Sequence, residues 1–291
     1  MRDLTALGIS LRATRGPPRA TLGDAVARAF LGHTCETPEM RSVAAVCVLI
    51  LAGGFLAGCA VLGAKSAPVT SATSPSGEVV TTDWSDFPAH AGVAGEPLLE
   101  YPDQSELPDR AREIMAGISE AIERESGLTL TPLEPEAEWF DDSNWHPQES
   151  NGYGGQSMLT TVNCCELQSV STPDPRKWRA VLDAASDAAI AVGLDGFVLD
   201  EHTIDCNGED DCWLWTATAT DGVQWVNFAV QDGSRDPSGE ASRDAAEFGW
   251  PLASIAIGYG ATVVESGRHD DYVEAMRPFV GQNRPPATTS D

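Results

Sequence analysis

Two polar stretches of this sequence carry residue types that could do chemistry. In the first, Trp139 and Trp145 lie close to Asp141 and His146, so aromatic rings, a carboxylate and an imidazole share one loop. Such a set could bind a sugar or a peptide, and the adjacent acids Asp141 and Asp142 could supply acid–base catalysis in a glycan hydrolase. Adjacent loop acids are more often only solvated, and loop aromatics often fold over a core. Ligand binding is therefore one of two interpretations here.

The second stretch is an acidic loop with oxygen donors of the kind that bind calcium. Its candidate ligands are Asp205, Asn207, Glu209 and Asp211. A calcium loop of the EF-hand type has a glycine at its sixth position and a bidentate glutamate at its twelfth. Counted from Asp205, the glycine is fourth and a threonine is twelfth. A solvated acidic tip fits the pattern better, and calcium remains the alternative.

Four cysteines in the second half of the chain could form disulfides: Cys164, Cys165, Cys206 and Cys212. An even number in an exported chain is typical of disulfide bonding. The local pair Cys206–Cys212 would leave a vicinal Cys164–Cys165 bond, yet neighbours in a strand point to opposite faces. Cross-pairing between the two groups is therefore attractive, with one disulfide plus free thiols as an alternative. The spacings disfavour a zinc site.

An apolar run, Val43–Phe55, ends in Leu56-Ala57-Gly58-Cys59, which has the pattern of a bacterial lipobox. A signal peptide needs a basic start, an apolar stretch of about 7–15 residues and small residues at the cut. Met40 and Arg41 followed by this run supply these features. In such a motif the thiol of Cys59 receives a diacylglyceryl group. We expect residues 40–58 to be removed and Cys59 to anchor the chain at the outer face of the cell membrane.

Residues 1–39 do not fit this scheme, because they hold several arginines and no convincing apolar periodicity. We predict that Met40 is the true start and that 1–39 is a gene-prediction error or a disordered extension. The alternative is a cytoplasmic tail before a membrane span, since Ser42–Leu62 is just long enough to cross a bilayer. In both cases the preceding arginines place the later residues outside.

Composition limits the classes of function. The net charge of −26 argues against nucleic-acid binding, which depends on lysine and arginine neutralising phosphates. Eight tryptophans favour a packed core over disorder. No catalytic motif of the Gly-x-Ser-x-Gly, Walker or His-Glu-x-x-His type occurs in the chain. We therefore expect a protein that is not an enzyme and uses no cofactor.

Periodicity and turn residues predict the elements that must position these groups. We expect a flexible tether over 59–104, an α+β domain over 105–280 and a disordered tail over 281–291. The predicted helices are 107–125, 175–192 and 270–280, from apolar stripes at helical spacing with Pro at the start or Gly at the end. The predicted strands are 128–131, 156–170, 196–204, 213–220 and 223–231, with 138–140 as a possible extension and 254–265 as a strand or a loop-rich edge element. Asp221-Gly222 is a hairpin signal between two of them.

The order α-β-β-α-β-β-β predicts an α+β fold, with two helices packed on one face of a mostly antiparallel sheet. The chain resembles the actinobacterial LppA-like lipoproteins in several features. These are the lipobox at Cys59, Ala111-Arg112-Glu113 opening the first helix, a cysteine-bearing strand at Cys164, Trp178 opening the second helix and Gly193-Leu194 closing it. The resemblance covers roughly 105–265 and carries no activity with it. The Cys164–Cys165 pair and the Cys206/Cys212 loop are possible departures from its pattern.

These observations together predict a membrane-tethered envelope lipoprotein whose domain acts in binding or interaction. Its expected partners are the membrane, through the lipid on Cys59, and an envelope protein or wall polymer. A cell-wall glycan hydrolase acting through the Asp141–His146 loop, or a calcium or small-ligand module, are the alternatives.

Overall fold

A computed structural model of the protein describes residues 67–73, 77, 79–201, 203 and 212–288. In this part of the chain the main sheet has seven strands in the order β3-β5-β9-β8-β7-β6, with β4 beside β5, and all pairs are antiparallel. The strands are β3 Thr131–Pro132, β4 Trp145–Pro147, β5 Leu159–Ser169, β6 Val198–Leu199, β7 Leu214–Thr220, β8 Gln224–Asp232 and β9 Ala253–Val264.

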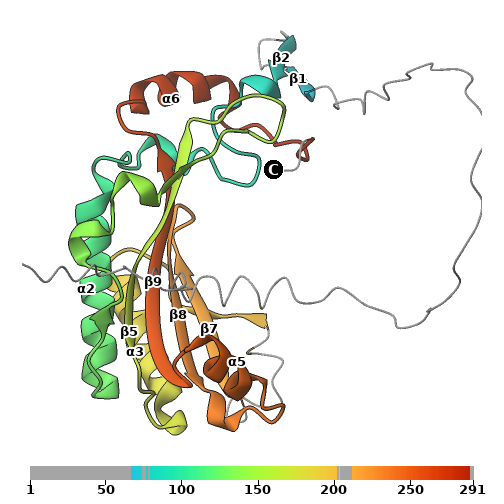
Figure 1. The fold of residues 1–291 in the computed structure, drawn as a ribbon. Helices are drawn as coiled ribbons and strands as arrows, with labels where there is room; N and C mark the ends of the chain where they lie inside the picture. The colour runs from blue at the N-terminus through green and yellow to red at the C-terminus, as the bar shows by residue number, and fades with distance from the viewer. Residues whose placement is uncertain (1–66, 74–76, 78, 202, 204–211, 289–291) are drawn as a thin grey trace, which may run out of the picture. The chain divides into compact units, whose positions relative to one another are not determined.

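Two long helices, α2 (Leu107–Ser126) and α3 (Trp178–Ala191), pack against each other and against one face of this sheet (Figure 1). Pro108 suits the first turn of α2, and Gly127 ends it in a left-handed conformation, at φ 74°. Asp174 accepts a hydrogen bond from the backbone N–H of Arg176 and so opens the turn that leads into α3. The α+β class and the two covering helices are as predicted.

Shorter helices complete the described fold. The helix α5 spans Glu240–Phe248 and α6 spans His269–Met276. Single 3-10 turns are η1 Trp84–Asp86, η2 Pro97–Leu99, η3 Glu136–Glu138, η4 Asp142–Asn144, η5 Pro175–Lys177, η7 Gly233–Arg235 and η8 Arg277–Phe279. The proposed strand extension at 138–140 is therefore wrong, because the end of η3 and a turn occupy it.

The strand β9 is the main topological correction. The sequence left 254–265 as a strand or a loop-rich edge element. In the structure Ala253–Val264 lies between β5 and β8 and pairs with both (Figure 1). Its glycines and alanines suit this position, because small side chains let neighbours from both flanking strands lie across it.

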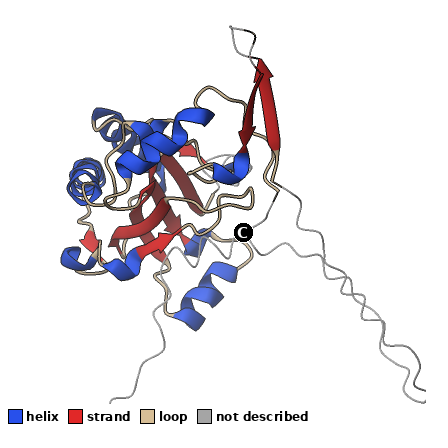
Figure 2. Cartoon of the chain, turned by 90° about the horizontal axis from the view of Figure 1, so that it is seen from above, coloured by secondary structure: helices blue, strands red, loops and turns tan. Residues whose placement is uncertain are grey.

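Part of the segment predicted as a flexible tether is folded. A separate hairpin of β1 (Val69–Thr73) and β2 (Val79–Asp83) precedes η1 and stands apart from the main sheet (Figure 2). After it, Trp84, Phe87 and Leu98 are at most 2% exposed and belong to the hydrophobic core. The segment from 79 to 104 is thus part of the folded domain, because it supplies large apolar side chains that a tether would leave in water.

One buried side chain, Asn151, joins this segment to the body of the domain. Its Nδ2 donates to the carbonyls of Trp84, Ser85 and Phe87 at 2.9–3.3 Å. Its Oδ1 accepts from the backbone N–H groups of Tyr153 and Gly155 at 2.8 and 3.0 Å. The side chain replaces water for five backbone groups in a region with no regular ladder.

The carboxyl-terminal residues up to 288 are also fixed on the domain, where the sequence predicted a disordered tail. Arg284 donates to the carbonyls of Ala91 and Val93. The hydroxyl of Tyr153 donates to the carbonyl of Pro285 at 2.8 Å, and the N–H of Thr288 donates to Gly152 at 2.9 Å. Polar composition misled the prediction, because backbone carbonyls elsewhere in the fold hold this segment.

Candidate functional site

The two tryptophans of the predicted aromatic loop are core residues. Trp139 is 3% exposed and Trp145 is 9% exposed, and both belong to the main hydrophobic cluster. The indole N–H of Trp139 donates to the carbonyl of Glu134 at 3.3 Å. Trp145 packs beside Phe140, with ring centroids 6.3 Å apart. Neither ring is available to stack on a ligand. Of the two interpretations of this loop, the one in which its aromatic rings fold over the core is correct.

The acids and the histidine of the same loop lie on the surface. Asp141, Asp142 and His146 are all exposed, and His146 is in the edge strand β4 opposite Thr161. None of the three lines the pocket that is described below. The arrangement that a glycan hydrolase would need, two carboxyl groups facing each other across a cleft, is not formed by these residues.

The acidic loop of Asp205, Asn207, Glu209 and Asp211 lies outside the described residues, as do Cys206 and the lipobox with Cys59. Calcium binding there stays a prediction. Within the described ranges, no group of three or more His, Cys, Asp or Glu side chains is placed to hold a metal ion.

The cysteines pair differently from the expectation. Cys164 and Cys165 form a vicinal disulfide. Alternation along a regular strand argued against this bond, but β5 is not regular there: its register with β9 shifts between Cys164 and Leu167, and Cys165 has φ 66°. Cys212 is also disulfide-bonded, with a partner outside the described residues. Cross-pairing of Cys164 or Cys165 with the later cysteines is therefore wrong.

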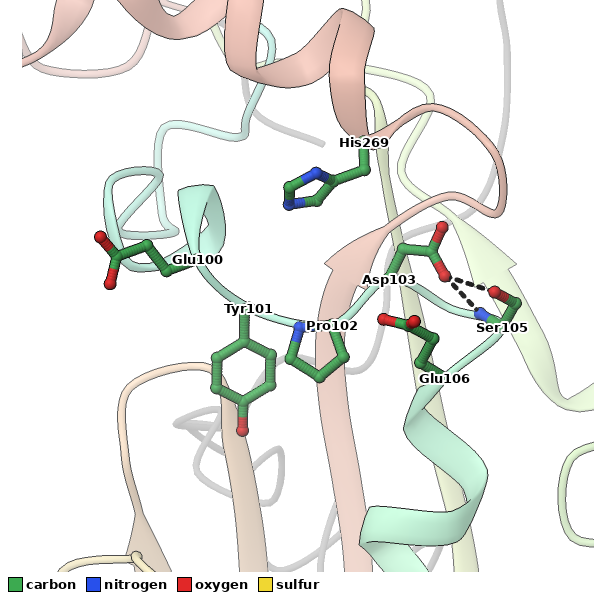
Figure 3. A pocket seen from close by; sticks show the side chains of 7 residues that line it. All are labelled: Glu100, Tyr101, Pro102, Asp103, Ser105, Glu106 and His269. Atoms are coloured by element: carbon green, nitrogen blue, oxygen red, sulfur yellow. Dashed lines mark hydrogen bonds between the residues drawn. The ribbon is translucent and has the colours of Figure 1, made fainter.

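A pocket of about 490 Å³ opens between the segment before α2 and the start of α6 (Figure 3). His269 overhangs Tyr101 and Pro102, and the carboxylate of Glu100 points away from the imidazole (Figure 3). The lining residues are Glu100, Tyr101, Pro102, Asp103, Ser105, Glu106 and His269. The sequence did not single out any of them.

The central carboxylate of this pocket serves the local fold. Asp103 accepts from the N–H and hydroxyl of Ser105 at 2.8 and 2.6 Å, and from the N–H of Gly267 at 3.2 Å. Burial raises the pKa of Asp103, but the hydrogen bonds from Ser105 and Gly267, with the charge of His269, lower it further, so the net shift is downward. An ionised Asp103 thus holds together the turns before α2 and after β9.

A polar chain continues from the pocket into the sheet. The hydroxyl of Tyr101 donates to Asp221 at 2.8 Å, and the Nε2 of Gln224 donates to the same carboxylate at 3.1 Å. The hydroxyl of Tyr259 donates to Oε1 of Gln224 at 2.8 Å. Burial, followed by the hydrogen bond to Asp221, raises the pKa of Tyr101, and burial raises that of Tyr259. Both phenols stay neutral donors, which suits a structural network better than proton transfer.

A different set of exposed side chains lies on the second face of the sheet. The ring of Trp215 meets Trp178 of α3 with centroids 5.7 Å apart, so Trp215 faces the helices. By the strand register, Trp225 and Asn227 of β8, Gly260 of β9 and Asn163 of β5 face the opposite way. Asn163 and Asn227 are exposed and Trp225 is half-buried. The sequence contained a signal for this, because in β8 Trp225 alternates with the buried Val226 and Phe228 and shares its side of the strand with the polar Asn227.

No protein-family model matches the chain, and no curated protein matches it. Among solved structures, a crystal structure of the candidate lipoprotein LppA from Mycobacterium tuberculosis aligns with 68% of this chain and 90% of its own, at 10% identity and a TM-score of 0.34. No helix in the described part of the chain is both long and apolar enough to cross a bilayer.

Proposed function

We propose that the chain is an envelope lipoprotein, acylated on Cys59, whose α+β domain binds a ligand or partner at the outer face of the membrane. The observation that carries the proposal is the placement of Leu56-Ala57-Gly58-Cys59 directly after an apolar run of signal-peptide length. At about 0.8 kcal/mol per buried CH₂, one acyl chain binds a membrane only marginally, while two or three hold firmly.

The fold adds a distance to this proposal. The described domain starts at residue 67, eight residues after Cys59. Since a fully extended chain advances at most about 3.6 Å per residue, this spacer reaches no more than about 29 Å. A tether running to residue 104 would have reached several times further. The proposed role is therefore binding close to the membrane surface.

The test is mass spectrometry of the native protein, with detergent partitioning of two variants. We expect the first residue to be a diacylated or triacylated Cys59 and the protein to enter the detergent phase. Cys59→Ala should move it to the aqueous phase. Cys47→Ala is the matched control, because Cys47 lies inside the apolar run and should leave acylation unchanged. A mature protein that still carries residues 1–58 would refute the proposal.

A further inference from the structure

We propose that the sheet face turned away from α2 and α3 binds a neutral saccharide, with Trp225 as the stacking platform and Asn163 and Asn227 as the amides that bind hydroxyl groups. The proposal names a ligand class for the binding role proposed above, and it does not depend on the acyl anchor.

The platform is made by a tryptophan lying on a glycine. A Cβ added to Gly260 would come within 2.3–2.5 Å of three atoms of the Trp225 indole, Cε2, Cζ2 and Nε1. The ring therefore rests directly on the backbone of β9. Gly260 covers part of the ring, and the side chain as a whole is half-buried. A flat ring held in this way loses little conformational entropy when a ligand stacks on it.

Polar groups surround the ring in a regular grid. Thr220, Trp225, Gly260 and Asn163 form one row across four strands. With strands about 4.8 Å apart, Asn163 stands about 10 Å from Trp225 at the backbone; the indole lies over Gly260 between them, so Asn163 flanks the ring. Asn227 lies two residues along β8, about 7 Å away. Gly258 of β9 is paired with Asn227, and no atom lies within 4 Å of the position that a Cβ on Gly258 would take.

The orientation of these groups leaves donors for a ligand. The hydroxyl of Thr218 donates to Oδ1 of Asn227 at 3.3 Å, so the Nδ2 of Asn227 can donate outward. Asn163 makes no side-chain hydrogen bond within the part of the chain that the structure describes. On the other side of the ring, the hydroxyls of Thr161 and Thr262 lie 2.9 Å apart, and only one of them can donate to the other. Binding sites for small polar ligands use a few such groups around an apolar surface.

Charge selects the ligand class. The chain has a net charge of −26, yet the residues of β7, β8 and β9 on this face, with Thr161 and Asn163 of β5, include no charged side chain. Two carboxylates belong to these strands and their edge: Glu166 lies in the bulge of β5, and Asp200, next to the end of β6, accepts from the hydroxyl of Thr216 on this face. A cation would find on this face only the Asp200 carboxylate at the β7 edge, which is already hydrogen-bonded to Thr216, and an anion would be repelled by the net negative charge of the chain. A sugar ring, with a C–H face for the indole and hydroxyls for the amides, fits.

The experiment measures binding of the full chain, purified in detergent, to insoluble chitin, amylose and mannan. We expect saturable binding to at least one of them and a loss of about tenfold in affinity for Trp225→Ala. Trp225→Tyr, which keeps a flat ring, should retain most of the affinity, while Trp225→Leu should not. Asn163→Ala and Asn227→Ala should each weaken binding several-fold. Trp250→Ala is the matched control, because Trp250 packs on Phe248 at the end of α5, away from the platform.

The outcomes separate the two proposals. Unchanged circular dichroism and Trp225→Tyr binding exclude misfolding as the cause of a loss. Binding to none of the three polymers, or an equal effect of Trp225→Ala and Trp250→Ala, overturns the saccharide site. Cys59→Ala should abolish acylation and leave saccharide binding intact, so failure of the anchor and failure of the site are distinguishable.

Discussion

Asn151 is the residue whose replacement should damage the fold most specifically. Its side chain is fully buried and serves five backbone groups, three carbonyls and two N–H groups. In Asn151→Ala the N–H groups of Tyr153 and Gly155 lose the acceptor that the structure gives them. A buried polar group left without a partner costs about 1–3 kcal/mol. The loss of the acceptor for two N–H groups and of the donor for three carbonyls should therefore lower the free energy of unfolding by about 3–5 kcal/mol.

The assay is urea unfolding of the Cys59→Ala chain, followed by tryptophan fluorescence. The probe is well placed, because the buried Trp84 belongs to the segment that Asn151 holds. A loss of this size is a large part of the 5–15 kcal/mol typical of a folded domain. Asn163→Ala is the matched control: the same substitution at an exposed site should change stability by less than about 0.5 kcal/mol.

Asn151→Asp sharpens the argument through its pH dependence. A carboxylate cannot donate to three carbonyls, so the protonated acid is favoured in the folded state and the folded-state pKa lies above the unfolded one. The stability of this variant should therefore fall as pH rises from about 4 to 7. Two results would refute this reasoning: a cost of less than about 1 kcal/mol for Asn151→Ala, or equal stability of Asn151→Asp at both pH values. Either would mean that the Asn151 side chain does not hold the segment around Trp84 and Phe87 on the domain.

Three further predictions follow from single contacts. Gly260→Ala places a Cβ 2.3 Å from the Trp225 ring, so it should lower the free energy of unfolding by about 1–3 kcal/mol and shift the tryptophan emission. Gly258→Ala is the control and should be nearly neutral, because no atom lies within 4 Å of its added Cβ. Equal effects of the two variants would contradict the stacking of Trp225 on Gly260. Hydrogen bonds and charge from Arg176 lower the pKa of Asp174 to about 2, so carboxyl NMR should show it titrating there, and Arg176→Gln should return it towards its ordinary value of 3.8. Because the folded-state pKa is the lower one, this stabilisation is present above pH 3.8 and is lost as pH falls through about 2; an unchanged Asp174 in Arg176→Gln would refute the pairing. Alkylation of the unfolded chain without reductant should leave Cys164 and Cys165 unmodified within one peptide, and a peptide cross-linked from either to Cys206 or Cys212 would disprove the vicinal bond.

Local patterns predicted the elements whose signals are contained within one segment. The stripe of Ile114, Ile118 and Ile122 predicted α2, and Gly127 marked its end. Asp221-Gly222 predicted the hairpin of β7 and β8, which the structure contains. These features depend on residues within a few positions of each other, so the sequence is sufficient to find them.

Long-range contacts decided what the sequence missed. The long strand β9 is central because β5 and β8 flank it, and no local pattern states which strands are neighbours. The segment around Trp84 and Phe87 is ordered because Asn151, about sixty residues later, binds its carbonyls. The vicinal disulfide depends on a bulge that the pairing of β5 with β9 creates.

The sites divide in the same way. The sequence alone predicts a lipobox at Cys59, since a signal peptidase motif is a local pattern, and it predicted the α+β class that the structure confirms. Only the tertiary structure showed that Trp139 and Trp145 are core residues and that Trp225 is not. Burial is a property of the whole packed domain, and the identity of a tryptophan does not reveal which of its faces meets other residues. The row that joins Trp225 to Asn163 is formed by the strand register, which brings together side chains more than sixty residues apart.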